Sequence, residues 1–482
     1  MIHVSLVPRS CDRCYTSKER CIWAPGSLTC ERCARVGHAC RSKRPIKRVG
    51  RPPGGYLSSS MKRTRLGTQK SDMSAKRNKN TATTVTTTTT TTTTLAPAMV
   101  EGSIGQTLLS TIEGLGQPEL DLLNRTIHQD DFTEQFVIGP SFYHGHRQKL
   151  VFHLLSSRRI VLDAYLAFAL SCGDQAQVNT SYKKAASALF TLRSIQIKDH
   201  LDITSCLMLG WQLLHFVFQL GGREILQVCS QTLSLLKPHY AAGKHFETSH
   251  LSFLTSIILT ETAECLMMTK LPTLKLHHAE ASSHIDGCVG LCTGLLLHLY
   301  DLAAINVDMQ NRSRQGQCKT KGLPDLPTKL EDVRLKIRDW KPQLQTKIFA
   351  KFTALEVAHM LCQHQIMQTA ALLIIHRLQH RFGKEDGTAS ALAATILSQI
   401  DLTVHVTGKS PLCVDLPLIV ACLEVEDDSA REQRLRSLSA IGRHSAVFCD
   451  RIKSMVMQVW TARRQGRIVF WHDIGHLLSR FS

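Results

Sequence analysis

Apolar residues recur with the period of an α-helix along most of the chain from residue 104 to the end. One such stretch places five apolar residues on a single helix face before a glycine stop signal: Ile366, Ala370, Leu373, Ile374, Leu378 and then Gly383. Further helices are expected near 147–157, 158–172, 182–194, 199–217, 222–237, 250–270, 288–305, 329–340, 388–406, 412–424, 429–464 and 466–480. Because strand signals are few, the pattern predicts a large all-α body.

The pattern changes before this body. Residues 46–103 are basic at first and then rich in Ser and Thr, with an unbroken run of Thr from 86 to 94. Such a segment cannot bury enough apolar surface to offset its ordering entropy, so we expect a disordered linker. It also lacks the apolar heptads of a coiled coil, so a homodimer would have to form through the body. We therefore expect three parts, with bounds at 1–45, 46–103 and 104–482.

Charge is concentrated at the start of the chain of 482 residues. The whole chain carries a formal charge of +19, of which residues 1–80 hold +15 and the remainder only +4. A basic head on a nearly neutral body indicates a polyanion-binding module, with nucleic acid as the leading candidate. A membrane surface is the weaker alternative, because no amphipathic helix, lipidation motif or stretch of 18 apolar residues supports it. The start lacks the apolar region of a signal peptide, so we expect an intracellular protein.

Cysteine spacing supplies the strongest chemical signal. Six of the 17 cysteines repeat the unit C-x2-C-x6-C twice: Cys11, Cys14, Cys21, Cys30, Cys33 and Cys40. Two cysteines separated by two residues can place both sulfurs on one metal. Six thiolates could serve one zinc with two left over, or two zincs that share two sulfurs, and the symmetry of the repeat favours Cys11 and Cys30 as the bridging pair. Metal binding would then supply the folding free energy of this small region.

The residues CDRCYTSKERC, the loop IWAPGSLT and CERCARVGHAC resemble the binuclear zinc-cluster (Zn2Cys6) transcription factors of fungi. The resemblance implies two Zn2+ per chain, a short helix in each half, and a lysine that reads a CGG-type triplet of double-stranded DNA in the major groove. Lys18 occupies the position of that lysine, and nearby arginines would mostly hold phosphates: Arg13, Arg20, Arg32 and Arg35. Tyr15 and Ser17 depart from the family, whose members often carry basic residues there.

A basic arm follows the last of the six cysteines, and its cations include Lys43, Arg44, Lys47, Arg48 and Arg51. Within it, Gly50-Arg51-Pro52 resembles the core of an AT-hook, which inserts an arginine into a narrow minor groove. The alternative, which we favour, is a flexible tail that adds affinity by counterion release and acts as a nuclear import signal. The string from Lys47 to Arg51 is also similar to one in regulators of the aflatoxin-pathway type, which implies control of secondary-metabolite genes.

The body resembles the all-helical regulatory domain of fungal transcription factors across most of residues 140–480. The resemblance is carried by SYKKAASALFTLRS, LMLGWQLLHF, ALLIIHRLQHRFG and WTARRQGRIVFWHDIGHLLSRF. It implies contacts with the transcription machinery or co-regulators and no catalysis. We therefore expect a nuclear, sequence-specific regulator of transcription by RNA polymerase II. The alternative is a helical scaffold or co-regulator whose basic head binds nucleic acid without selecting sequence.

Two features of the body bear on other possible functions. His472 and His476 have the spacing of a zinc protease motif, but Asp473 replaces the required glutamate and no third ligand follows, so we expect a structural helix and no enzyme. The acidic stretch from Glu424 to Asp428 could belong to an activation surface. A charged helix cap or loop is the favoured interpretation.

Overall fold

The computed structural model describes two separate parts of the chain. Near the start it describes residues 11, 14, 16–18, 21, 22, 29–37 and 40, and in the body it describes 115–173, 177–243, 246, 248–281, 285–314, 326–342 and 348–479. The chain divides into two compact units, Met1–Thr94 and Leu95–Ser482. The predicted linker 46–103 lies outside the described residues.

The described residues form helices and no strands, with a single isolated bridge between Asp286 and Gly290. The first unit holds the short helix α2 (Glu31–Arg35). The second begins with α4 (Gln117–His128), α5 (Asp130–Thr133), α6 (Pro140–Ser156), α7 (Arg158–Ser171), α8 (Val178–Ser194), α9 (His200–Gln219), α10 (Ile225–Ala241), α11 (Thr248–Met268) and α12 (His278–Ala281). It continues with η2 (Cys292–Leu295), α13 (Leu296–Arg314), α14 (Leu326–Asp339), α15 (Ile348–Lys351), α16 (Ala354–Gln379), α17 (Asp386–Thr407), α18 (Asp415–Cys422), α19 (Asp428–Ile441), α20 (Ala446–Arg464), η3 (Trp471–Asp473) and α21 (Ile474–Ser479). The expected mainly α fold is confirmed.

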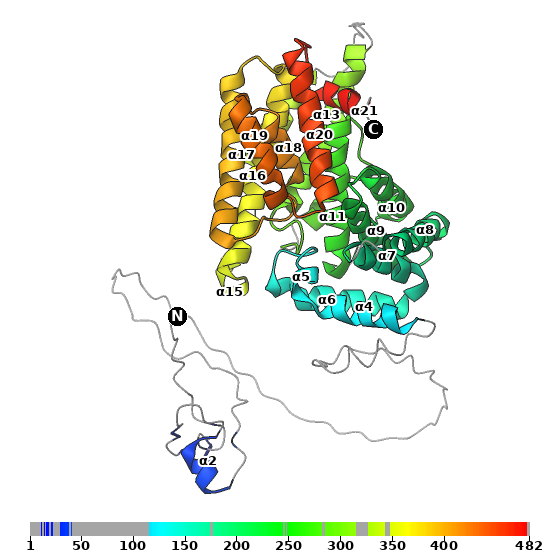
Figure 1. The fold of residues 1–482 in the computed structure, drawn as a ribbon, viewed down its shortest axis with the longest axis vertical. Helices are drawn as coiled ribbons and strands as arrows, with labels where there is room; N and C mark the ends of the chain where they lie inside the picture. Colours follow the sequence, from blue (N-terminus) through cyan, green and yellow to red (C-terminus); the bar gives the residue numbers. More distant parts are fainter. Residues whose placement is uncertain are drawn as a thin grey trace, which may run out of the picture. The chain divides into compact units, whose positions relative to one another are not determined.

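Within the second unit the helices form two groups joined by α11 and α13 (Figure 1). In one group α7 packs on α8 and α9, and α10 packs on α9 and α11. In the other, α16 and α17 lie side by side and both contact α18. The axes of the long helices α13, α16, α17 and α20 are nearly aligned, with α16 and α17 antiparallel, and α4 and α6 cross one end of the unit.

Helix α9 lies at the centre of the core. Asp199 caps its first turn by accepting a hydrogen bond from the backbone N–H of Asp202, at 2.9 Å. Every residue from Ile203 to Phe218 is buried, so this helix is enclosed by its neighbours on all sides. Trp211, among the largest fully buried side chains of the described residues, packs here against Phe136 and Phe253.

A second anchor ties the start of α16 to the start of α6. Thr353 and Glu356 form a capping box at the first turn of α16. The Glu356 carboxylate also accepts hydrogen bonds from the backbone N–H and the hydroxyl of Ser141, both at 2.7 Å. A side chain on Gly139 would overlap Glu356, because a Cβ there would lie 2.6 Å from its Cγ. This one carboxylate therefore fixes two elements that are 215 residues apart.

The expected single helix over 429–464 was wrong. The chain breaks between α19 and α20, where the Ser445 hydroxyl accepts a hydrogen bond from the backbone N–H of Phe448 and begins a new helix. Gly442 ends α19, and a Cβ at this position would lie 2.6 Å from the sulfur of Cys449. The prediction relied on helical periodicity alone, which continues across the cap and the tight contact that end one helix and begin the next. Helix α4 was not predicted at all.

Three helices are long and apolar enough, by length and composition alone, to cross a membrane: His200–Gln219, Leu251–Met268 and Asp386–Thr407. The expectation that no such stretch exists was wrong, because an average over 18 residues tolerates polar positions that interrupt an apolar run. The first two are 89% and 72% buried within the helical unit, whereas the third is 33% buried. The first two helices therefore bury most of their apolar surface in the core of this unit.

Candidate zinc centre and DNA-reading surface

The six cysteines of the first unit make the same contacts in each half of the repeat. The sulfur of Cys11 accepts a hydrogen bond from the backbone N–H of Cys14, and the sulfur of Cys30 accepts one from Cys33, both at 3.4 Å. The backbone N–H of Cys11 points at the sulfur of Cys21 (3.2 Å), and that of Cys30 at the sulfur of Cys40 (3.3 Å). The duplicated spacing of the sequence therefore folds into duplicated local geometry.

The six sulfurs fall into two groups of four that have Cys11 and Cys30 in common. One group adds Cys14 and Cys21 and the other adds Cys33 and Cys40, with all ligand atoms of each group within 4.8 Å of one another. The sulfur–sulfur distances are 3.8 Å for Cys11–Cys30, 3.6 Å for Cys11–Cys33 and 3.7 Å for Cys14–Cys30. Zinc–sulfur bonds of about 2.3 Å in a tetrahedron place the sulfurs about 3.8 Å apart, so this donor set fits zinc.

The shared sulfurs differ electrostatically from the other four. Burial opposes ionisation of Cys11, but hydrogen bonds from Cys14 outweigh it and lower the pKa of Cys11 to about 6. The same balance, with hydrogen bonds from Cys33, lowers the pKa of Cys30. Burial raises the pKa of the four remaining thiols: Cys14, Cys21, Cys33 and Cys40.

The expected DNA contacts can be placed for three residues. Lys18 is exposed in a turn, with φ of 52° in the left-handed region. Arg35 is exposed at the end of α2, and the guanidinium of Arg32 donates a hydrogen bond to the hydroxyl of Ser17 at 3.0 Å. The other residues of the expected surface lie outside the described part of the chain: Arg13, Arg20, Lys43, Arg44, Lys47, Arg48 and Arg51.

A six-cysteine centre fitted to zinc, carried by a chain with a large all-helical body, defines the class of zinc-cluster transcription factors. A profile described as the fungal specific transcription factor domain matches residues 148–479, so the chain belongs to this family. The family consists of transcription factors and is not an enzyme class. The resemblance seen in the sequence is confirmed.

A curated relative matches the cysteine-rich part. The chain is 51% identical over 43 residues to a protein described as C6 finger transcription factor traC, from Penicillium crustosum. The match covers 9% of this chain and only about a tenth (10%) of the length of the relative. No solved structure matches the chain significantly.

The two histidines of the protease-like motif do not form a site. His472 is buried in η3 at 7% exposure, whereas His476 lies exposed in α21. The carbonyl of His472 accepts hydrogen bonds from Thr269 and Gln310, which fixes this residue as part of the packing. Among the described residues, the only groups arranged to hold a metal ion are those of the six cysteines.

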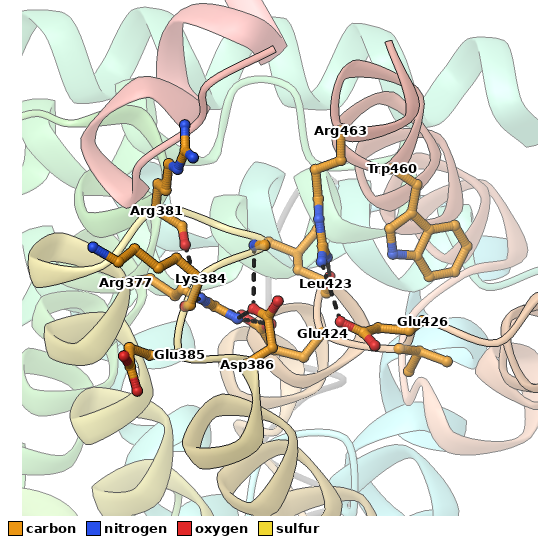
Figure 2. A network of polar contacts seen from close by, with 12 residues as sticks. Arg377, Arg381, Lys384, Glu385, Asp386, Leu423, Glu424, Glu426, Trp460 and Arg463 are labelled. Atoms are coloured by element: carbon orange, nitrogen blue, oxygen red, sulfur yellow. Dashed lines mark hydrogen bonds and ion pairs between the residues drawn. The ribbon is translucent and has the colours of Figure 1, made fainter. Parts of the chain in front are cut away.

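The acidic stretch from Glu424 to Asp428 contains one buried carboxylate, that of Glu424, followed by exposed acidic residues at the start of α19. The buried guanidinium of Arg377 donates hydrogen bonds to both carboxylate oxygens of Glu424, at 2.7 and 2.6 Å, and also binds Asp386 (Figure 2). Asp427 caps α19 by accepting a hydrogen bond from the backbone N–H of Ala430. The favoured interpretation, a charged cap and loop, is therefore confirmed. No local pattern of residues indicated that Arg377 would be the partner of Glu424.

Proposed function

We propose that this protein is a nuclear, sequence-specific regulator of transcription by RNA polymerase II. Its zinc cluster holds two Zn2+ ions, with Cys11 and Cys30 each bonded to both. The observation that supports this proposal is the pair of four-sulfur groups that have these two residues in common. Two tetrahedral zincs need eight bonds from six sulfurs, and two bridging sulfurs supply the difference.

In this proposal Lys18 reads the DNA sequence. Its ammonium donates to the O6 and N7 acceptors of guanine in a CGG-type triplet, a contact worth about 1–3 kcal/mol of discrimination. The arginines of the cluster and the cations of the arm at 43–51 bind phosphates and position the module. Because Lys18 is exposed, this contact needs no rearrangement of the cluster core.

Selection of bound sequences from random DNA tests the proposal most directly. The full-length protein should enrich CGG-containing duplexes, and Lys18→Ala should lose the triplet preference while retaining affinity for unrelated duplexes. Removing the arm cations should instead reduce the salt dependence of binding for every sequence alike. If no sequence is enriched, the chain is a helical co-regulator with an unselective basic head.

The biological target follows from the arm. The segment from Lys47 to Arg51 supports the regulation of a secondary-metabolite gene cluster, by its similarity to regulators of the aflatoxin-pathway type. Genome-wide occupancy should then show discrete peaks at promoters of such a cluster. The number and spacing of half-sites in the selected DNA would also report whether the protein binds as a homodimer.

A further inference from the structure

The turn between α19 and α20 carries a half-buried cation, Arg443. The Nη1 nitrogen of its guanidinium is buried and has no hydrogen-bond partner among the described residues. Burial lowers the pKa of this guanidinium, although the nearby carboxylate of Glu134 works against the shift. Leaving a donor of a charged group buried and unpaired is costly, and a ligand that accepts a hydrogen bond from Nη1 would remove this cost.

The neighbours of Arg443 hold it in place. The ring of His444 stacks on Phe218, with centroids 4.0 Å apart and an interplanar angle of 7°, and its Nε2 lies 3.1 Å from Asp415. On the same turn, the hydroxyl of Ser445 donates to the carbonyl of Phe218 at 3.0 Å. The backbone at Arg443 is therefore fixed before any ligand arrives, which reduces the ordering cost of binding.

Arg443 lines a hollow of about 400 Å³ that opens to solvent. The acidic residues around it are already matched or lie at the surface. Glu134 accepts hydrogen bonds from Lys409 at 2.5 Å and from the hydroxyl of Tyr143 at 2.7 Å, and Asp131 is exposed. The guanidinium of Arg443 is thus the cation of this hollow, and the nearby carboxylate of Glu134 is already engaged by Lys409 and Tyr143.

A second, inner cavity of about 90 Å³ adjoins the first, since Gln135 and His444 line both. Its wall is mainly apolar and includes Leu214, Leu259, Met367, Leu416, Ile419 and Phe448. The acidic groups of this wall already have partners, because Glu264 pairs with Arg451 and Asp415 forms a hydrogen bond with His444. The inner cavity therefore accepts apolar groups and offers no free cation.

We propose that the two hollows form one binding site for a small molecule that carries a carboxylate on a short apolar body. The carboxylate binds the guanidinium of Arg443, whose planar fork matches carboxylate geometry. The apolar body fills the inner cavity, as is usual for sites with a few placed polar groups in an apolar wall. The site belongs to the helical unit and does not depend on the DNA reading proposed above.

Isothermal titration calorimetry of the full-length, zinc-loaded protein with hexanoate tests the proposal without DNA. We expect saturable binding of one hexanoate, and at least tenfold weaker binding of acetate, which lacks the apolar body, and of hexanol, which lacks the charge. Arg443→Gln should weaken hexanoate binding at least tenfold. The matched control is Arg436→Gln, at an exposed position of α19, which should leave the affinity unchanged.

A second variant keeps the test decisive if the first one fails to fold. Ala263→Leu adds volume to the wall of the inner cavity but retains Arg443, so it should weaken hexanoate and spare acetate. The proposal is overturned if hexanoate does not bind saturably, if acetate binds equally well, or if neither variant changes the affinity. Any of these results would leave the proposed DNA reading untouched, because no DNA is present.

Discussion

The ion pair between Arg377 and Glu424 illustrates how strongly one residue can determine local structure. Both side chains are buried, at 0% and 2% exposure, and Arg377 also donates hydrogen bonds to the carbonyls of Arg381 and Lys384. It thereby joins the end of α16, the following turn and the segment after α18. Removal of the guanidinium would leave the buried carboxylate of Glu424 without its partner.

Arg377→Met should therefore destabilise the helical unit by about 3–5 kcal/mol, the usual cost of breaking a buried pair. Urea unfolding followed by circular dichroism at 222 nm measures this change. Arg436→Met is the matched control, since Arg436 pairs with Glu432 at the surface and should contribute little. Equal stability of the two variants would contradict a structural role for the buried pair.

Two buried histidines predict how stability depends on pH. Burial lowers the pKa of both His146 and His215 to about 3, against an ordinary value of 6.5. Their neutral forms are favoured in the folded state, so their contribution is complete above pH 6.5 and is lost as the pH falls towards 3. At pH 5 each of the two histidines should lower the free energy of unfolding by about 2 kcal/mol relative to neutral pH.

His146→Phe isolates this effect, because the Nε2 nitrogen of His146 has no partner and its ring stacks on Phe136. We expect the loss of stability between pH 7.5 and pH 5 to shrink by about 2 kcal/mol in this variant. Urea unfolding at both pH values provides the measurement. The exposed His405→Gln on α17 should keep the full dependence, and an unchanged slope in both variants would refute the prediction.

At the scale of elements, the approach of α9 to α10 depends on one glycine. A Cβ at Gly210 would lie 2.2 Å from the Oγ1 of Thr232 on α10, so Gly210→Ala should force the helices apart and cost about 1–3 kcal/mol. Gly145→Ala on α6 meets no atom within 4 Å and should stabilise its helix by up to about 1 kcal/mol. Thermal unfolding compares them, and a shift of the same sign in both would contradict the packing argument.

The elements predicted from periodicity were those whose apolar face repeats without interruption. Helix α9 was predicted at 199–217, because its apolar run and Asp199 cap act locally. The break before Ser445 was missed, because it depends on Gly442 meeting Cys449 and on the carbonyl of Phe218, which lies 227 residues away. The surroundings of Arg443 could not be predicted for the same reason, because they come from segments near residues 131–135 and 443–445 that no local pattern connects.

At the scale of the whole molecule, each of the two units is stabilised by a different interaction. The second unit has one large apolar core. Among the described residues of the first unit, the buried cluster consists of four cysteines: Cys11, Cys14, Cys30 and Cys33. Sequence spacing alone could predict this centre, because six thiols in a duplicated unit carry their ligand geometry within 30 residues. Metal binding must supply the folding free energy that apolar burial supplies elsewhere.

A zinc chelator should therefore unfold the first unit and leave the second unit folded. We expect the protein to contain two zincs per chain by elemental mass spectrometry, and chelation to remove both and abolish DNA binding. The circular dichroism at 222 nm and the unfolding of the helical unit should persist, because its core contains no predicted zinc ligand. Cys14→Ser should lose zinc and DNA binding in the same way, whereas Cys172→Ser, at an exposed position of the helical unit, should retain both. Retention of DNA binding after complete zinc removal, or melting of the helical unit on chelation, would contradict this division.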